Sequence, residues 1–219
     1  MKIKIIGDSI AAGVGSSELI DTNEIIFEDE VSVFYKRIAP NSWWGLLEKR
    51  LKNKNIKIEN LGCGGAYTYQ ILEHFKELIN EEDDMIFILM GLNDRKRNNG
   101  LEELYNNLTQ IINKIKEQNK KIILLTPPPS TKENENYLNR IYHTDEIVKI
   151  IKKVSINEKV ILIDIYQYIN DYLNNNNIKI EDITYGEGCK NDGLHPGDKL
   201  QKLMYEKVIT EIERVIWKH

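Results

Sequence analysis

The stretch MIFILMGLND, residues 85–94, decides the fold. Its first six residues form the most continuous apolar run of the chain, and its last four are typical of a turn. A strand that is buried on both faces has this pattern, because its side chains meet other elements on either side. The stretch therefore predicts a central strand of a parallel sheet, with its carboxyl end at the polar turn.

Strand and helix patterns alternate on both sides of this stretch. Short apolar runs typical of strands occupy residues 3–6, 56–61, 121–125 and 160–163. Helical spacing of apolar residues occurs over 43–52, 68–80, 101–118, 137–154 and 197–217, and Thr68 is the expected N-cap of the second helix. This alternation predicts an α/β fold, a three-layer α/β/α sandwich with a flavodoxin-like five-stranded parallel sheet.

The chain shows no internal repeat, no low-complexity linker and no domain boundary, so residues 1–219 are expected to form a single domain. Residues 16–41 form a long, insertion-like connection, and loops of this length are often functional. Its apolar side chains could form a lid over a site, a homodimer surface or a locally packed loop; these are Phe27, Val31, Val33, Phe34 and Tyr35.

Composition excludes several classes of protein. The 219 residues are 41% hydrophobic and 29% charged with a net charge of −4, which predicts no bulk attraction to nucleic acid and no stable membrane association. No run approaches the roughly 20 apolar residues of a membrane-spanning helix. The amino terminus lacks a signal-peptide pattern, so a cytoplasmic protein is expected, or a secreted one if a leader has been removed.

The sequence also argues against cofactors and metals. Cys63 and Cys189 form neither a disulfide framework nor a CxxC motif, and each is expected to be a small buried residue. No cluster of His, Asp and Glu has metal-ligand spacing. No glycine-rich phosphate loop of the GxGxxG or GxxxxGKS type is present, which disfavours a nucleotide or flavin binder.

Polar and small residues follow the predicted strands. GDS at 7–9 follows the first strand, three glycines at 62, 64 and 65 follow the second, and GLND at 91–94 follows the third. The segment DGLHP at 192–196 precedes the last helix. Because the carboxyl ends of parallel strands share one edge of a sheet, these segments are expected to meet there. Together they supply the groups that acyl transfer requires.

Each of these residues suggests a chemical role. Ser9 is the expected nucleophile, His195 its general base, and Asp192 the carboxylate that orients the imidazole. The backbone N–H groups of Ser9 and Gly65 and the side-chain amide of Asn93 are the expected donors to a tetrahedral oxyanion. Taken alone, Ser9 could cap a helix and Asn93 could belong to a turn.

These segments resemble the four signature blocks of the SGNH, or GDSL-like, hydrolases. The blocks are GDSI at 7–10, the turn at 60–65, GLND at 91–94 and DGLHP at 192–196, in the family's order and over nearly the whole chain. The resemblance implies that Ser9, Gly65, Asn93 and His195 are the four named residues, with Gly64 as an alternative to Gly65. It also implies the same α/β/α sandwich and a serine esterase activity.

Some positions depart from the family pattern. Ala11 stands where members often carry Thr, and Leu200 stands where a Gly often occurs. Neither departure removes a catalytic group, whereas the long connection at 16–41 weakens any analogy of substrate. Trp44 and Tyr67 are the aromatic residues expected to contact substrate, together with Gly64.

The expected activity is hydrolysis of a short-chain carboxylic ester through an acyl-enzyme intermediate. An O-acetyl group on a carbohydrate or another small polar alcohol is the expected substrate, without a cofactor. A lysophospholipase, an acyl-thioesterase and an O-acyltransferase remain alternatives, because one constellation serves all of them. A non-catalytic binding module is a further alternative. Asp8 and Asp94 are interpreted as loop organisers, His74 as a residue on a helix surface, and His143 as a structural rather than a catalytic residue.

Overall fold

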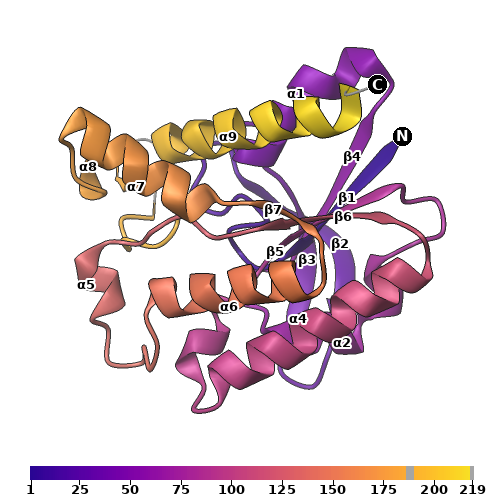
Figure 1. Cartoon of the computed structure of the whole chain (residues 1–219), viewed down its shortest axis with the longest axis horizontal. Coiled ribbons are helices and arrows are strands. Elements are labelled where there is room, and N and C mark those ends of the chain that lie inside the picture. Colours follow the sequence, from indigo (N-terminus) through magenta and orange to yellow (C-terminus); the bar gives the residue numbers. More distant parts are fainter. Residues whose placement is uncertain (186–189, 218–219) are drawn as a thin grey trace.

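The computed structural model describes residues 1–185 and 190–217, and it contains the predicted parallel sheet (Figure 1). The strand order is β4-β1-β5-β6-β7, and every pair in it is parallel. The strands are β1 Lys2–Gly7, β4 Lys57–Gly62, β5 Met85–Leu89, β6 Lys121–Leu125 and β7 Ile161–Ile163. The apolar run quoted above forms β5, the central strand, as predicted.

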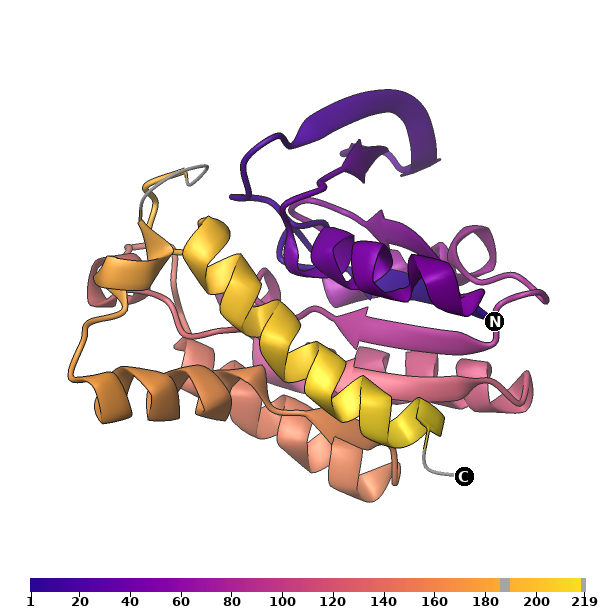
Figure 2. The same ribbon diagram turned by 90° about the horizontal axis from the view of Figure 1, so that it is seen from above.

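Helices cover both faces of this sheet and confirm the three-layer sandwich. One face carries α1 Trp43–Leu51, α7 Ile165–Asn176 and α9 Asp198–Trp217, with α9 running diagonally across the sheet (Figure 2). The opposite face carries α2 Thr68–Glu73, α3 Phe75–Leu78, α4 Gly100–Glu117 and α6 Thr144–Asn157. Shorter elements are η1 Lys52–Lys54, η2 Asp94–Lys96, α5 Lys132–Glu135 and α8 Glu181–Thr184.

The pleat of β5 explains why its sequence is continuously apolar. Met85, Phe87 and Leu89 point into the core beneath α1 and α9, whereas Ile86 and Ile88 point into the core above α4 and α6. All five side chains are buried. Successive residues of a strand face opposite sides, so a strand covered on both faces needs apolar side chains at every position.

Helix α4 shows the matching helical pattern. Leu104, Leu108, Ile111, Ile112 and Ile115 are fully buried and share one face of the helix, since they are spaced by three or four residues. This face packs on the sheet, between α2 and α6. The helix therefore forms because one apolar stripe can be buried, as its sequence predicted.

The connection at 16–41 is an antiparallel hairpin rather than an irregular loop. It consists of β2 Ile20–Glu28 and β3 Val33–Ile38, and it rises above the rest of the molecule in Figure 2. Phe27 and Phe34 anchor it, with ring centroids 4.6 Å apart and both side chains buried. Phe27 also stacks on His74. The other three apolar residues named above are exposed: Val31, Val33 and Tyr35.

One predicted helix start and one predicted N-cap were wrong. The helix expected over 137–154 begins only at Thr144, because the carbonyl oxygen of Arg95 accepts hydrogen bonds from the backbone N–H groups of Ile141 and Tyr142. The predicted cap Thr68 lies inside α2, and its hydroxyl donates to a carboxylate oxygen of Asp94. Long-range partners therefore decide where α6 begins and what the Thr68 hydroxyl contacts. The sequence analysis also failed to predict α7.

Truncation of the α4 stripe should destabilise the protein. We expect Leu108→Ala to lower the free energy of unfolding by about 2–5 kcal/mol, since it deletes buried methyl groups and leaves a cavity while alanine keeps the helix. Ile156→Ala, at an exposed position of α6, should change it by no more than about 0.5 kcal/mol. Urea unfolding of both variants measures the two effects, and equal shifts in midpoint would contradict the assigned core.

Candidate active site

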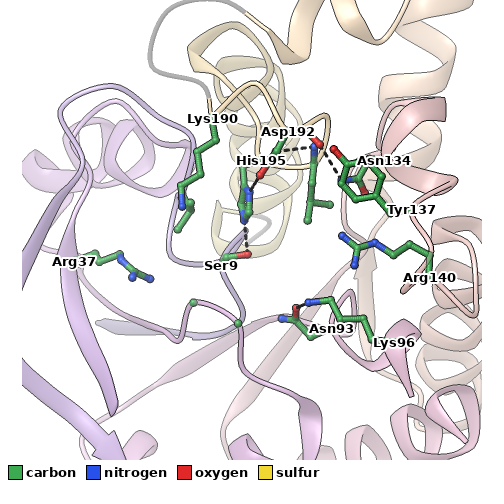
Figure 3. Close-up of a pocket in the computed structure, with 14 residues that line it drawn as sticks. Ser9, Arg37, Asn93, Lys96, Asn134, Tyr137, Arg140, Lys190, Asp192 and His195 are labelled. Atoms are coloured by element: carbon green, nitrogen blue, oxygen red, sulfur yellow. Dashed lines mark hydrogen bonds and ion pairs between the residues drawn. The ribbon is translucent and has the colours of Figure 1, made fainter. Parts of the chain in front are cut away.

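A cavity of about 300 Å³ opens at the edge of the sheet where the carboxyl ends of the strands lie (Figure 3). Six of the eight residues that the sequence singled out line it: Ser9, Gly64, Gly65, Asn93, Asp192 and His195. They come from the loops after β1, β4 and β5 and from the loop before α9. The tertiary structure thus gathers segments that are up to 186 residues apart in the chain.

Ser9, His195 and Asp192 form a hydrogen-bonded series. The Ser9 hydroxyl oxygen lies 2.9 Å from Nε2 of His195, and Nδ1 of the same ring lies 2.5 Å from a carboxylate oxygen of Asp192 (Figure 3). The second carboxylate oxygen accepts hydrogen bonds from the backbone N–H groups of Leu194 and His195. Burial acts to raise the pKa of Asp192, but these hydrogen bonds outweigh it and hold that pKa well below its usual range.

The loop that carries Asp192 and His195 is held by the segment after β6. The backbone N–H of Thr131 donates to the carbonyl of Gly193 at 2.8 Å, and the side-chain amide of Asn134 donates to the carbonyl of Asp192 at 2.9 Å. Gly193 has φ +70°, and a Cβ there would lie 2.0 Å from the Thr131 hydroxyl. Glycine is therefore required for the loop to approach this segment so closely.

The Ser9 loop depends on the buried carboxylate before it. Asp8 is almost fully buried, and one of its oxygens accepts a hydrogen bond from the backbone N–H of Ile10 at 2.9 Å. Burial raises the pKa of Asp8. The Ser9 hydroxyl faces His195 and caps no helix. Asp8 organises the turn, as the sequence suggested, and Ser9 is left free to face the cavity.

The expected oxyanion donors surround the same space. Gly65 is exposed at the cavity, with no atom within 4 Å of the position that a Cβ would take. The Asn93 amide nitrogen donates to the carbonyl of Ala66 at 3.0 Å, and its oxygen accepts from the Lys96 ammonium at 2.9 Å. An amide nitrogen carries two hydrogens, so one remains for a further acceptor. These contacts determine which way the Asn93 amide points.

Asp94 links the Asn93 loop to α2. It is fully buried, and its carboxylate accepts a hydrogen bond from the Thr68 hydroxyl at 2.5 Å. Burial raises the pKa of Asp94 to about 7, although the hydrogen bonds from Thr68 oppose the shift. Asp94 therefore holds the loop in place and does not line the cavity, which agrees with its interpretation as a loop organiser.

Two residues expected to contact substrate do not line the cavity. The interpretation of Trp44 was wrong, because its ring belongs to the core beneath α1 and its indole N–H donates to the carbonyl of Ala12. The amphipathic pattern of α1 buries that face of the helix. Tyr67 lies near the site but stacks with Tyr69, under the guanidinium of Arg97.

Cys63, His74 and His143 stand outside the hydrogen-bonded series. Cys63 is buried in the core and does not line the cavity, and burial raises the pKa of its thiol to about 12. Cys189 and His219 lie outside the described residues. His143 contacts Glu135 on the surface, and His74 stacks on Phe27. Within the described part of the chain, no group of three or more His, Cys, Asp or Glu residues could hold a metal ion.

Several residues of the cavity were not foreseen from the sequence. They are Val14, Arg37, Lys96, Asn134, Tyr137, Arg140, Lys190 and Leu194. Two of them had a local signal: Lys96 follows Asn93 by three residues in the same short turn, and Leu194 belongs to the DGLHP segment. Val14 lies in the turn that follows Ser9. The remaining five reach the cavity through the hairpin, through the segment 126–143 and through the loop before α9, whose paths depend on long-range contacts. Across the described residues, no helix is long and apolar enough to span a membrane.

The buried carboxyl of Asp94 should make stability depend on pH. Its folded pKa of about 7 exceeds the value of about 3.9 expected in an unfolded chain, so the folded state binds more protons between these two values. Stability is therefore lost as the pH rises from about 4 to about 7. We expect Asp94→Asn to remove this loss, which can reach roughly 1.4 kcal/mol per pH unit.

Urea unfolding at several pH values between 4.5 and 7.5 measures this effect. The stability of the wild type relative to Asp94→Asn should fall as the pH rises. The free energy of unfolding of Asp171→Asn, at an exposed position of α7, should change with pH in the same way as that of the wild type. A constant difference between wild type and Asp94→Asn across this range would show that Asp94 does not titrate as described.

Comparisons with known proteins give several matches to this chain. The model of the GDSL-like lipase/acylhydrolase family matches residues 5–203. An arylesterase of Vibrio mimicus is 24% identical over 195 residues, which are 86% of each chain. A lipase/acylhydrolase from Enterococcus faecalis superposes with a TM-score of 0.72 at 23% identity, over 98% of this chain and 96% of that one.

A further solved structure has the same fold. It is a variant of an acetyl xylan esterase from Geobacillus stearothermophilus, with a TM-score of 0.70 at 19% identity, over 96% of this chain and 94% of that one. The two structural likenesses establish the fold, and the family model covers most of the chain.

Proposed function

Because this chain belongs to the GDSL-like lipase/acylhydrolase family and is a carboxylic ester hydrolase, we propose that it removes short acyl groups through an acyl-enzyme. The acyl group is acetyl, carried by a sugar or another small polar alcohol. The observation that carries this proposal is the contact of 2.9 Å between the Ser9 hydroxyl and Nε2 of His195, in series with Asp192.

The first half of the reaction forms the acyl-enzyme. Nε2 of His195 takes the hydroxyl proton as Oγ of Ser9 bonds to the ester carbonyl carbon, and the carbonyl electron pair moves onto its oxygen. The N–H groups of Ser9 and Gly65 and the Asn93 amide donate to that oxyanion. Asp192 stabilises the imidazolium, since its depressed pKa keeps it ionised. Collapse breaks the bond to the alcohol oxygen, which takes the proton from His195.

The second half releases the acid. Water attacks the acyl-enzyme while His195 takes one of its protons, and a second tetrahedral intermediate forms in the same oxyanion hole. When this intermediate collapses, the bond to Ser9 breaks and Oγ recovers the proton from His195. The enzyme is regenerated, and the net change is one ester and one water converted to an alcohol and an acid.

The size of the cavity supports a small substrate. Its volume of about 300 Å³ is at the lower end of the roughly 300–1,000 Å³ that small-molecule sites occupy. Polar and charged side chains line much of it, including Asn93, Asn134 and Arg140. A long acyl chain would need a longer apolar channel to leave water. The name of the Geobacillus relative, an acetyl xylan esterase, points in the same direction.

Hydrolysis of p-nitrophenyl esters from acetate to palmitate tests this proposal. We expect acetate to be the best substrate, and Ser9→Ala and His195→Ala each to lower kcat/KM by at least about 10³-fold, because either change removes a member of one catalytic unit. Ser155→Ala, in α6 and away from the cavity, is the matched control and should retain wild-type activity.

The same panel separates the alternatives. Faster turnover of long chains, still dependent on Ser9, would move the substrate toward lysophospholipids or acyl-thioesters. Acylated alcohol formed with little free acid would indicate an acyltransferase. Failure of Ser9 to react with a fluorophosphonate probe, together with no Ser9-dependent hydrolysis, would reject the serine-esterase mechanism.

A further inference from the structure

The described lining of the cavity is strongly cationic. Arg37, Lys96, Arg140 and Lys190 line it, whereas Asp192 is the single carboxylate among the described lining residues. The whole chain, in contrast, has a net charge of −4. Figure 3 shows Arg37 and Lys190 on one side of Ser9, and Lys96 and Arg140 on the other. The positive charge is therefore local to the site and does not follow from overall composition.

Within the described residues, little of this charge is neutralised. Asp192 is already hydrogen-bonded to His195. Arg37 forms an ion pair with Asp21 through Nε, while its terminal nitrogens approach Gly64 at the cavity. Among the described residues, the other three cations form no ion pair with a carboxylate: Lys96, Arg140 and Lys190. Another carboxylate, Glu135, already forms an ion pair with Arg95 and accepts a hydrogen bond from the backbone N–H of Thr144.

Two of these cations are also partly buried. Burial lowers the pKa of both Lys96 and Arg140, and the positive charges of Arg140 and Arg95 lower that of Lys96 further. Nε of Arg140 is buried without a hydrogen-bond partner. Burying a charge that lacks a counterion destabilises a protein, because the lost hydration is not replaced. An anion bound in the cavity would supply the missing counter-charge.

We propose that the natural substrate is an ester whose small alcohol carries an anionic group, a carboxylate or a phosphate. This inference rests on the proposed function, since it names the substrate class of the same site. The charge belongs to the alcohol because an acetyl group has no room for it. The anion lies against Arg140 and the neighbouring cations while the ester carbonyl faces Ser9. A sugar acid or a phosphorylated small alcohol would meet this requirement.

The test compares esters that differ in charge but share a small aryl scaffold. The probes are 4-acetoxybenzoate, 4-acetoxyphenyl phosphate and the neutral 4-acetoxybenzamide, with each kcat/KM divided by the rate constant for hydrolysis by hydroxide. We expect the anionic esters to exceed the amide by about tenfold or more at low salt, mainly through a lower KM. The preference should shrink as salt is added, because ions screen the attraction.

Substitutions at the cations identify the source of this preference. Arg140→Gln and Lys190→Gln should each lower the ratio of anionic to neutral kcat/KM by about threefold or more. Lys190 is exposed, so its substitution should leave folding intact. Lys49→Gln is the matched control, because Lys49 is an exposed residue of α1 outside the cavity, and its ratio should equal that of the wild type. Whichever anionic ester has the larger ratio of anionic to neutral kcat/KM identifies the preferred group as a carboxylate or a phosphate.

Three outcomes would overturn the inference. Equal normalised turnover of anionic and neutral esters, with hydrolysis still dependent on Ser9, would reject an anionic substrate and leave the esterase proposal standing. A preference that survives in both Arg140→Gln and Lys190→Gln would place its origin elsewhere. No Ser9-dependent hydrolysis of any probe or of the p-nitrophenyl esters would remove the proposed function and this inference with it.

Discussion

The parallel pairing of β1 between β4 and β5 is the constraint on which the site depends. Gly7, the last residue of β1, lies opposite Gly62 on one side and Leu89 on the other, so three strands end together at one edge. A Cβ at Gly7 would lie 1.8 Å from the carbonyl oxygen of Leu89, which leaves room only for glycine. The next residues of each strand therefore emerge side by side, and Ser9, Gly65 and Asn93 reach one cavity without distortion of the sheet.

Three aspartates show how environment assigns different tasks to one side chain. Asp8 and Asp94 are buried, which raises their pKa, and both bind the backbone or side chains of loops beside the cavity. Asp192 is partly exposed and accepts hydrogen bonds from His195 and two backbone N–H groups, which lower its pKa. Two carboxyl groups thus shape the loops, and the third remains ionised to orient the imidazole.

Two of the cations around Ser9 are carried by long connections between elements of the sheet sandwich. The hairpin of β2 and β3 brings Arg37 to the cavity, and the segment between β6 and α6 brings Arg140. The same segment supports Asp192 through Thr131 and Asn134. The catalytic geometry and the charge of the cavity are therefore built on shared backbone. A rigid sheet with variable loops at its carboxyl edge allows one chemistry to be directed at different substrates.

The sequence by itself determined the strands, their parallel arrangement and the residues that follow them, because apolar periodicity and glycine-rich strand ends are local properties. It also indicated Ser9, Asn93, Asp192 and His195, since the first two follow predicted strands and the last two precede the final helix. Only the tertiary structure decided that Trp44 is in the core, that α6 starts at Thr144 and that four cations meet around Ser9. These features depend on contacts between segments far apart in the chain, such as the carbonyl of Arg95 that holds residues 141–142 out of the helix. No local pattern of residue types records such contacts.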